Sequence, residues 1–314
     1  MAATATAQDV VRAPAVEAAL RRPPRSLWSN AWRQFRRHHL AMAGLVVLAV
    51  LLLASLLGPL VYRVSAYAID YSSELLGPSP QHPFGTDDLG HDLLARALLG
   101  GRVSMAVGIV AVLIAITLGT AVGAVAGFFG GRVDNLLMRL TDLFLALPVL
   151  PLLLLTIYLF RDLLRKTFGP EVGIFLLIVT MIGALNWMPL ARLVRASFLS
   201  IKQKEFVEAA RCLGASNRRL MLNHILPNTL SAVIVAATVG VGQAIITESA
   251  LSFLGLGFPP DMPTWGRLLF DAQNFLDLAP HWAIFPGLLI FLTVLSINYI
   301  GDGLRDALDP RKTS

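Results

Sequence analysis

Four polar side chains interrupt the long apolar runs of this sequence and are the first candidates for chemistry. Asp142, Asn186, Glu248 and Asn298 each lie within such a run. Ionisable and amide groups are costly inside a bilayer, so those that occur there usually have a function. The spacing of Asp142 and Arg139 favours an interfacial ion pair between them. Glu248 precedes a segment rich in Gly and Pro, where it either contributes to a gate or caps that segment. Asp142, Asn186 and Glu248 are therefore our candidates for a gate or a polar path across the apolar layer.

A second group of acidic and imidazole side chains lies in the connection after the first apolar run. In the sequence HPFGTDDLGHD, Thr86 can cap a short helix whose first turn carries Asp87 and Asp88, an arrangement that the helix dipole favours. Asp87, Asp88, His91 and Asp92 could together hold a cation. The alternative, which we favour, is an amphipathic surface helix without a ligand.

Several kinds of catalytic sequence are missing. A phosphate-binding loop needs Gly before its Lys, and none of Lys166, Lys202, Lys204 and Lys312 follows a glycine. The sequence contains neither HExxH nor a nucleophile elbow. The single cysteine, Cys212, cannot form an intrachain disulfide. We therefore expect no catalytic residue, no metal site and no cofactor on this chain, and any energy from ATP must come from another protein.

The composition indicates a membrane protein. The chain has 314 residues, of which 55% are hydrophobic and 15% charged, whereas soluble domains carry about 25% charged residues. About 20 apolar residues cross a bilayer. Six runs are long enough, namely 40–62, 103–128, 136–160, 172–194, 229–248 and 283–300. The first run is too long for a signal peptide and is interpreted as a retained span.

Prolines and glycines predict the shape of two of these runs. Pro148 and Pro151 should kink the third run, because proline removes a helical hydrogen bond and clashes with the preceding turn. Gly119, Gly123 and Gly127 recur at every fourth position of the second run, a spacing that allows another helix to pack closely.

The distribution of Lys and Arg predicts the orientation. With the N-terminus in the cytoplasm, 19 of the 26 basic residues fall on the cytoplasmic side, as the positive-inside rule favours. The net charge of +6 is explained in this way, without nucleic-acid binding. We divide the chain into a cytoplasmic tail 1–39 with a basic helix over 29–39, a membrane domain 40–301 and a cytoplasmic tail 302–314. The loop 195–228 then lies in the cytoplasm as well.

The segment SIKQKEFVEAARCLGASNRRLMLNHILP, residues 200–227, is polar and basic although it lies between two apolar runs. Ser200 and Gln203 have the spacing of a capping box, which predicts a helix start. Ala209 and Ala210, two small residues in the middle of this helix, would let a partner pack closely against its backbone. Its apolar face, at helical spacing, is formed by Phe206, Ala209, Ala210 and Leu213.

The end of this segment is marked by a glycine and a proline. Gly214 can adopt the left-handed conformation that ends a helix. A second short helix should follow Ser216 and end before Pro227, because proline is not tolerated in a helix interior. An ordinary amphipathic hairpin on a membrane surface is the alternative interpretation of the segment.

This segment resembles the EAA loop of the permease subunits of ABC importers. The matching positions are Glu208, Ala209, Ala210, Gly214, Leu226 and Pro227. HILPN at 224–228 is similar to the dipeptide, oligopeptide and nickel permeases. So is FGTDDLGHDLLAR, although His91 stands where those permeases have Arg and Ala95 where they have Ser. With NYIGDGLRDALDPR at 298–311, the resemblance covers nearly all of 31–311 and is specific to the second, C-type permease subunit.

The resemblance implies an all-α fold, that of a type I ABC importer permease with six transmembrane helices and a cytoplasmic EAA coupling loop. It implies a bacterial plasma (inner) membrane protein that forms a heterodimer with a homologous permease. Two ATP-binding subunits, which hold ATP and Mg²⁺, and an extracytoplasmic solute-binding protein would complete the system. The solute would be a dipeptide or oligopeptide. The alternatives are nickel or another small solute on the same scaffold, and a stand-alone secondary transporter.

Overall fold

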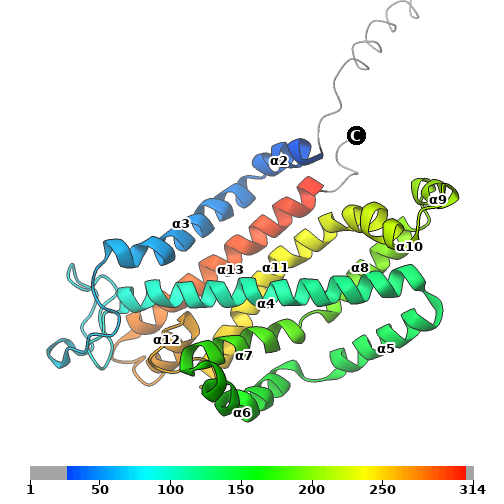
Figure 1. The fold of residues 1–314 in the computed structure, drawn as a ribbon. Helices are drawn as coiled ribbons and strands as arrows, with labels where there is room; N and C mark the ends of the chain where they lie inside the picture. Colours follow the sequence, from blue (N-terminus) through cyan, green and yellow to red (C-terminus); the bar gives the residue numbers. More distant parts are fainter. Residues whose placement is uncertain (1–26, 309–314) are drawn as a thin grey trace, which may run out of the picture.

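A computed structural model describes residues 27–308, and the regular structure within them is helical throughout (Figure 1). Our expectations for residues 1–26 and 309–314 lie outside the described residues. A single-turn 3₁₀ helix spans Tyr71–Ser73 and a π-helical turn spans Leu220–Ile225. The α-helices are α2 (Leu27–Arg37), α3 (His39–Val61), α4 (Leu93–Phe129), α5 (Gly131–Ala146), α6 (Val149–Phe168), α7 (Pro170–Ala184), α8 (Met188–Ile201), α9 (Glu205–Cys212), α10 (Asn217–Arg219), α11 (Leu226–Phe253), α12 (Trp265–Ala272) and α13 (Pro280–Leu308).

Up to six membrane spans can be assigned within the described residues. Four helical segments are long and apolar enough to cross a bilayer: α3, α4, the continuous helical segment Asn217–Phe253 and α13. Two further spans result if each of two bent helix pairs counts as one. These pairs are α5 with α6, bent by 83°, and α7 with α8, bent by 42°. The six predicted apolar runs fall on these elements, and the predicted all-α polytopic fold is confirmed.

Proline explains the sharper of the two bends. Leu147 is extended (φ −77°, ψ 138°), and Pro148 follows it directly. A residue before proline avoids the helical region, so α5 ends at this point. Pro151 lies in the first turn of α6, where its missing N–H costs nothing. The kink predicted from these two prolines is therefore a complete break.

Helix α4 runs along the length of the molecule and packs closely against α8 (Figure 1). A Cβ atom placed on Gly119 would lie 2.7 Å from the Trp187 carbonyl oxygen, and one on Gly127 would lie 2.6 Å from Cβ of Phe198. Real Cβ atoms do not come so close to other heavy atoms, so only glycine permits this separation. The predicted small-residue packing face is confirmed, and its partner is α8.

The connections 62–92 and 254–279 pack together at one end of the bundle, and we call them the loop cap. The short helix predicted after Thr86 is absent, because residues 85–92 are not helical. The Thr86 hydroxyl instead donates to the Ser73 carbonyl and accepts from the Leu76 N–H (2.8 Å). Asp92 caps α4, accepting from the Ala95 N–H at 2.8 Å. The predicted helix cap at Thr86 was wrong because the Thr86 oxygen forms these hydrogen bonds with residues 73–76 instead.

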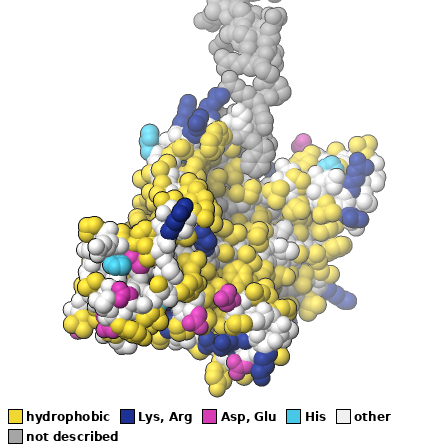
Figure 2. Space-filling view, turned by 60° about the vertical axis from the view of Figure 1, so that its left-hand side comes forward, with side chains coloured by type: hydrophobic (Ala, Val, Ile, Leu, Met, Phe, Trp, Pro, Cys, Tyr) yellow, Lys and Arg dark blue, Asp and Glu magenta, His cyan; other side chains and the backbone are white. Residues whose placement is uncertain are grey.

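The opposite end of the bundle holds α2, α9 and the C-terminal end of α13 (Figure 1). Helix α2 matches the predicted basic helix. Its Phe35 is buried against Gly303 of α13, which continues to Leu308. Figure 2 shows hydrophobic side chains over the middle of the molecule and acidic side chains gathered towards the loop cap. This distribution is typical of a protein whose middle is surrounded by lipid.

Candidate coupling surface and membrane path

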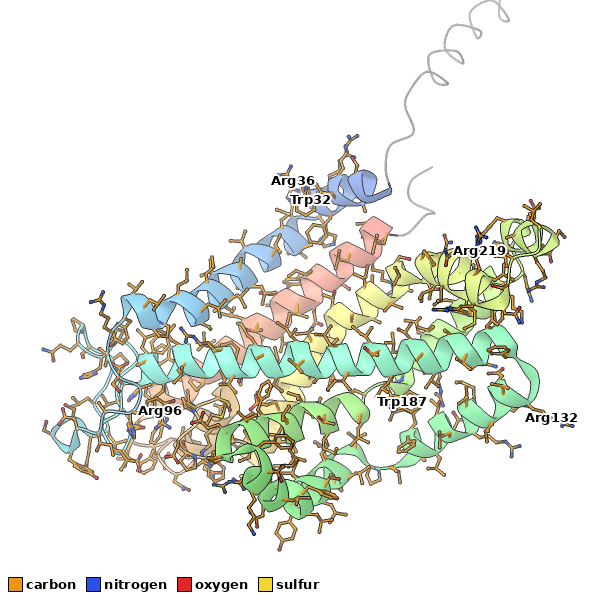
Figure 3. The ribbon with its side chains drawn as sticks, viewed as in Figure 1. Trp32, Arg36, Arg96, Arg132, Trp187 and Arg219 are labelled. Atoms are coloured by element: carbon orange, nitrogen blue, oxygen red, sulfur yellow. The ribbon has the colours of Figure 1, made fainter. Side chains whose placement is uncertain are left out.

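The predicted coupling loop projects from the end of the molecule opposite the loop cap. Figure 3 shows Arg219 beside α9 at this end, far from Arg96 at the other end. Ser200 lies inside α8, which ends at Ile201, and Lys204 is the N-cap of α9 without a side-chain cap bond. The predicted capping box of Ser200 and Gln203 was therefore wrong. Helix α8 simply extends further along the chain than its apolar pattern indicates.

The end of α9 has the geometry that the sequence predicts. Gly214 has φ +84°, and no atom lies within 4 Å of the position of a Cβ. The Gly214 N–H donates to the Arg211 carbonyl at 3.0 Å, and the Ala215 N–H donates to the Ala210 carbonyl at 3.1 Å. These two bonds form a Schellman motif, which turns the chain back by means of a left-handed residue. The predicted left-handed cap at Gly214 is confirmed.

Helix α9 buries one residue and leaves its small-residue face open. Val207 is completely buried in a cluster with Phe198 and Leu220. On the other side, Phe206 is 46% exposed and Leu213 is 89% exposed. Glu208 and Ala209 are exposed as well, and Ala210 is half-buried. An exposed apolar patch with small residues at its centre is typical of a surface that a partner covers.

Val207 is the anchoring residue that the sequence pattern did not reveal. The pattern grouped its neighbour Phe206 with the alanines, and a valine beside that face had no evident partner. Only the fold brings Phe198 and Leu220 to it. Val207 therefore fixes α9 against α8 and the π turn.

The chain passes from the coupling loop into α11 without a break. The predicted helix end before Pro227 was wrong, because Leu220–Ile225 forms a π turn that leads directly into α11. Leu226 donates its N–H to the carbonyl of Met221, five residues earlier, and Pro227 lies in the first turn of α11. The wider turn accommodates the proline ring, which would clash in a regular α-helix.

Two contacts tie α8 and its end to neighbouring helices. Lys202 donates to the Phe128 carbonyl at 2.5 Å, at the C-terminal end of α4, where the helix dipole favours a cation. Arg195 donates through Nη2 to Asp134 of α5 at 2.6 Å, as part of a two-point ion pair. The coupling loop is therefore joined to α4 and α5 as well as to α11.

A cavity of about 350 Å³ lies between α4, the α7–α8 break and α11. It contains Asn186, one of our three path candidates, whose amide donates to the Ile182 carbonyl at 2.7 Å. Gln243 supplies a second amide, and the remaining lining is apolar. The cavity therefore offers two uncharged polar groups within an apolar lining.

Asp142 does not line this cavity. Its carboxylate accepts from Arg192 of α8 at 2.5 Å, and both side chains are more than half exposed. The predicted pairing of Asp142 with Arg139 was wrong. The packing of α5 beside α8 brings Arg192, fifty positions along the chain, closer to Asp142 than Arg139, which lies one turn away on the same helix. An exposed ion pair of this kind contributes little to stability, of the order of 0–1 kcal/mol.

Glu248 lies fully buried outside the cavity, in a ring of hydroxyl groups. Its carboxyl group accepts from Ser104 of α4 at 3.1 Å and from Ser252 at 2.7 Å. The Ser104 oxygen also accepts from the Trp265 N–H of α12 at 3.2 Å. Glu248 therefore holds three helices together beneath the loop cap. This position favours the second of our two alternatives, in which Glu248 secures the Gly/Pro segment.

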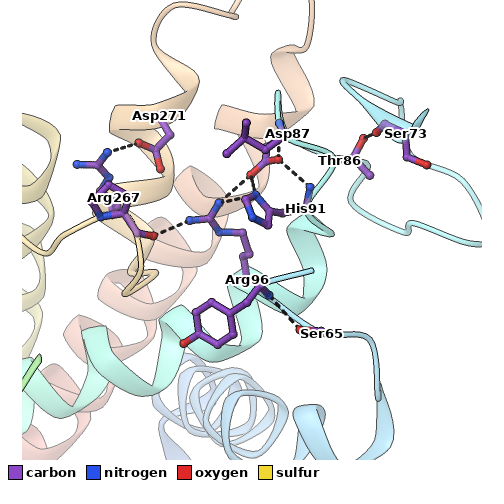
Figure 4. A network of polar contacts seen from close by, with 11 residues as sticks. Ser65, Ser73, Thr86, Asp87, His91, Arg96, Arg267 and Asp271 are labelled. Atoms are coloured by element: carbon purple, nitrogen blue, oxygen red, sulfur yellow. Dashed lines mark hydrogen bonds and ion pairs between the residues drawn. The ribbon is translucent and has the colours of Figure 1, made fainter. Parts of the chain in front are cut away.

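The acidic group of the loop cap forms two separate networks, of which Figure 4 shows the one around Asp87. Asp87 accepts from Arg96 at 2.7 Å and lies 2.8 Å from Nδ1 of His91. Asp92 accepts from Tyr62 at 2.7 Å and caps α4. Burial, together with this neighbouring carboxylate, raises the pKa of the Tyr62 phenol above its ordinary value. Among residues 27–308, no three such side chains converge as a metal would require. This arrangement does not favour the cation-site alternative, because Arg96 already neutralises Asp87.

Comparison with known proteins identifies the family. Residues 119–314 match the model of the binding-protein-dependent transport system inner membrane component. Residues 26–78 match the N-terminal transmembrane domain of oligopeptide transport permease C. The chain therefore belongs to this family of ABC importer permeases, and the resemblance to the C-type subunit is confirmed. It is a multi-pass membrane protein and a transport permease subunit.

Relatives match over most of the chain. The dipeptide transport system permease protein DppC of Alkalihalophilus pseudofirmus is 39% identical, covering 92% of this chain and 91% of its own length. The oligopeptide transport system permease protein OppC of Haemophilus influenzae is 41% identical, with coverages of 91% and 89%. The glutathione transport system permease protein GsiD of Pectobacterium atrosepticum is 39% identical, with coverages of 92% and 93%.

A solved structure supports the fold. The inward-facing MetNI methionine ABC transporter aligns with a TM-score of 0.52 and 17% identity, covering 69% of this chain and 96% of that chain. At this identity the likeness concerns the fold alone, which agrees with the type I permease fold that the sequence predicts.

Proposed function

We propose that this chain is a permease subunit of an ATP-driven importer and that it passes short peptides from a solute-binding protein into the cytoplasm. The observation that carries the proposal is the exposed apolar face of α9, held in a fixed shape by the Gly214 cap, on a chain of this family. The relatives named for dipeptide, oligopeptide and glutathione transport support the solute class.

In the proposed orientation, both termini and α9 lie in the cytoplasm of a bacterial cell, and the loop cap faces outward. An ATP-binding subunit covers Phe206, Ala209 and Leu213, and Glu208 pairs with a basic residue of that subunit. A homologous permease completes the membrane path. ATP and Mg²⁺ bind to the two ATP-binding subunits, so this chain acts without catalytic residues or cofactors of its own.

The central cavity supports peptides over nickel as the solute. Its polar lining in this chain consists of the amides of Asn186 and Gln243, which can exchange hydrogen bonds with a peptide backbone. Nickel would favour imidazole, thiolate or carboxylate ligands. None of the residues that line this cavity carries such a group.

Transport in a reconstituted system tests the proposal. The complete complex in proteoliposomes, with its binding protein, should take up a labelled dipeptide only when ATP and Mg²⁺ are supplied. Glutathione and Ni²⁺ serve as competitors. If uptake of the labelled dipeptide is inhibited by Ni²⁺ and not by glutathione, the solute is the metal. Uptake that is driven by an ion gradient without ATP would indicate a secondary transporter.

A further inference from the structure

We propose that a cavity in the loop cap binds the free carboxylate of a short peptide before the peptide enters the membrane path. The cavity has a volume of about 450 Å³, which lies within the usual range of small-molecule sites. It is bordered by the connection after α3, the start of α4, and residues 260–275. This inference deepens the proposed function and rests on it.

Three N–H groups around this cavity lack an acceptor. They belong to Nε of Arg96, Nε of Arg267 and Nε1 of Trp282, and all three residues line the cavity. Arg96 is 6% exposed and Trp282 is 1% exposed. Buried polar groups nearly always have a hydrogen-bond partner, so each exception needs an explanation. Three unpaired donors in the wall of one cavity point to an acceptor that enters this cavity and binds there reversibly.

The two arginines are fixed in place without using these donors. Arg96 donates through Nη1 to Asp87 at 2.7 Å and through Nη2 to the Pro260 carbonyl at 3.0 Å (Figure 4). Arg267 pairs with Asp271 at 2.7 Å, and its guanidinium lies 4.6 Å from the centre of the Phe270 ring. Because each positive charge already has a carboxylate partner, the site fits one carboxylate held by hydrogen bonds and disfavours a polyanion.

Two further carboxylates line the same cavity and make it complementary to a zwitterion. Asp261 is exposed and Asp88 is half-buried. Neither forms an ion pair or a hydrogen bond with the described residues. Buried N–H donors together with carboxylates nearer the solvent match the two charged ends of a short peptide. The carboxylate would bind at the donors, and the ammonium group would bind at Asp88 or Asp261.

Direct binding tests this site without the solute-binding protein. The purified complex in lipid nanodiscs would be titrated with the dipeptide Ala-Ala and with its C-terminal amide. We expect binding of Ala-Ala and at least roughly tenfold weaker binding of the amide, because a hydrogen bond to a charged group is lost. Trp282→Phe removes one N–H and keeps an aromatic ring against Phe275. It should weaken Ala-Ala binding several-fold and leave the amide unaffected.

Two variants complete the design. Trp32→Phe, the matched control at the opposite end of the molecule, should bind both ligands as the wild type does. Arg267→Lys keeps the positive charge beside Asp271 but removes Nε, so it should also weaken Ala-Ala binding, and it substitutes for Trp282→Phe if that variant does not fold. Equal affinity for Ala-Ala and its amide, or no binding of Ala-Ala, would overturn the site.

Three outcomes distinguish a peptide site in the loop cap from a docking contact and from a failure of the transport function. If Trp282→Phe weakens binding of the solute-binding protein and leaves Ala-Ala binding unchanged, the donors serve that protein and the proposal is wrong. ATP-driven uptake by a wild-type complex that does not bind free Ala-Ala would refute this site alone. Absence of ATP-driven uptake, with Ala-Ala binding intact, would refute the proposed function alone.

Discussion

Replacing Gly214 by valine tests whether the shape of the coupling loop matters for transport. Gly214 has φ +84° and open space around it, so a side chain meets no neighbour and the cost is purely conformational. A left-handed conformation costs an L-residue about 1–2 kcal/mol, and a β-branched residue lies at the upper end. If the cap opens instead, two hydrogen bonds of about 0.5–1.5 kcal/mol each are lost.

The expected effect follows from the smaller of these costs. A change of about 1–2 kcal/mol lowers the population of the capped loop relative to the open loop by a factor of about 5–30. No membrane span is touched, so the protein should still insert. We expect normal amounts of Gly214→Val in the membrane, with reduced solute-stimulated ATP hydrolysis and reduced uptake in proteoliposomes.

Two controls make the test specific. Gly214→Asn should retain more activity, because asparagine tolerates the left-handed region. Gly131→Val places the same strain at the first residue of α5, where φ is +53° and the space is also open. Normal uptake by Gly214→Val, or an equal loss in Gly131→Val, would refute the reasoning that the cap shapes a docking surface.

Three further results are expected. Glu208→Ala should weaken binding of the ATP-binding subunit, measured by co-purification, by more than the 0–1 kcal/mol that an exposed ion pair contributes. Glu205→Ala should change this binding little. Similar behaviour of the two variants would mean that docking depends on the backbone shape of the loop. Cys212 is exposed, so an impermeant thiol reagent should label it only after cells are permeabilised, and equal labelling of intact cells would reverse the orientation. Gly123→Ala forces a Cβ against the α8 backbone and should lower the free energy of unfolding by about 1–3 kcal/mol. Gly242→Ala meets only ordinary contacts of 3.5 Å or more and should be neutral or stabilising by up to about 1 kcal/mol; a ranking of the two opposite to this would contradict the packing argument.

Features that depend on the local chain were predictable from the sequence. The cap at Gly214 follows from the need for a left-handed residue after a short helix, and the break at Pro148 follows from the covalent geometry of proline. The six apolar runs follow from the thickness of the bilayer. In each case, the physical requirement is met within a few residues, so the residue type alone indicates the outcome.

Features that depend on distant contacts were not predictable. Thr86 has the character of a helix cap, but its oxygen bonds to a segment ten residues earlier or more. Asp142 pairs with Arg192 because α5 lies beside α8. The donors that border the loop-cap cavity come from three separate segments. For such groups the sequence gives the chemical type, and only the packing of helices determines the partner.

The packing of α3 against α13 has a consequence for biosynthesis. Gly44 of α3 is so close to α13 that an added Cβ would lie 2.8 Å from the Ser296 carbonyl oxygen. Among the described helices that could span the membrane, α3 is synthesised first and α13 last, so the face of α3 around Gly44 lacks this partner until α13 has been made. A chain that stops before α13 leaves this face and Phe35 uncovered.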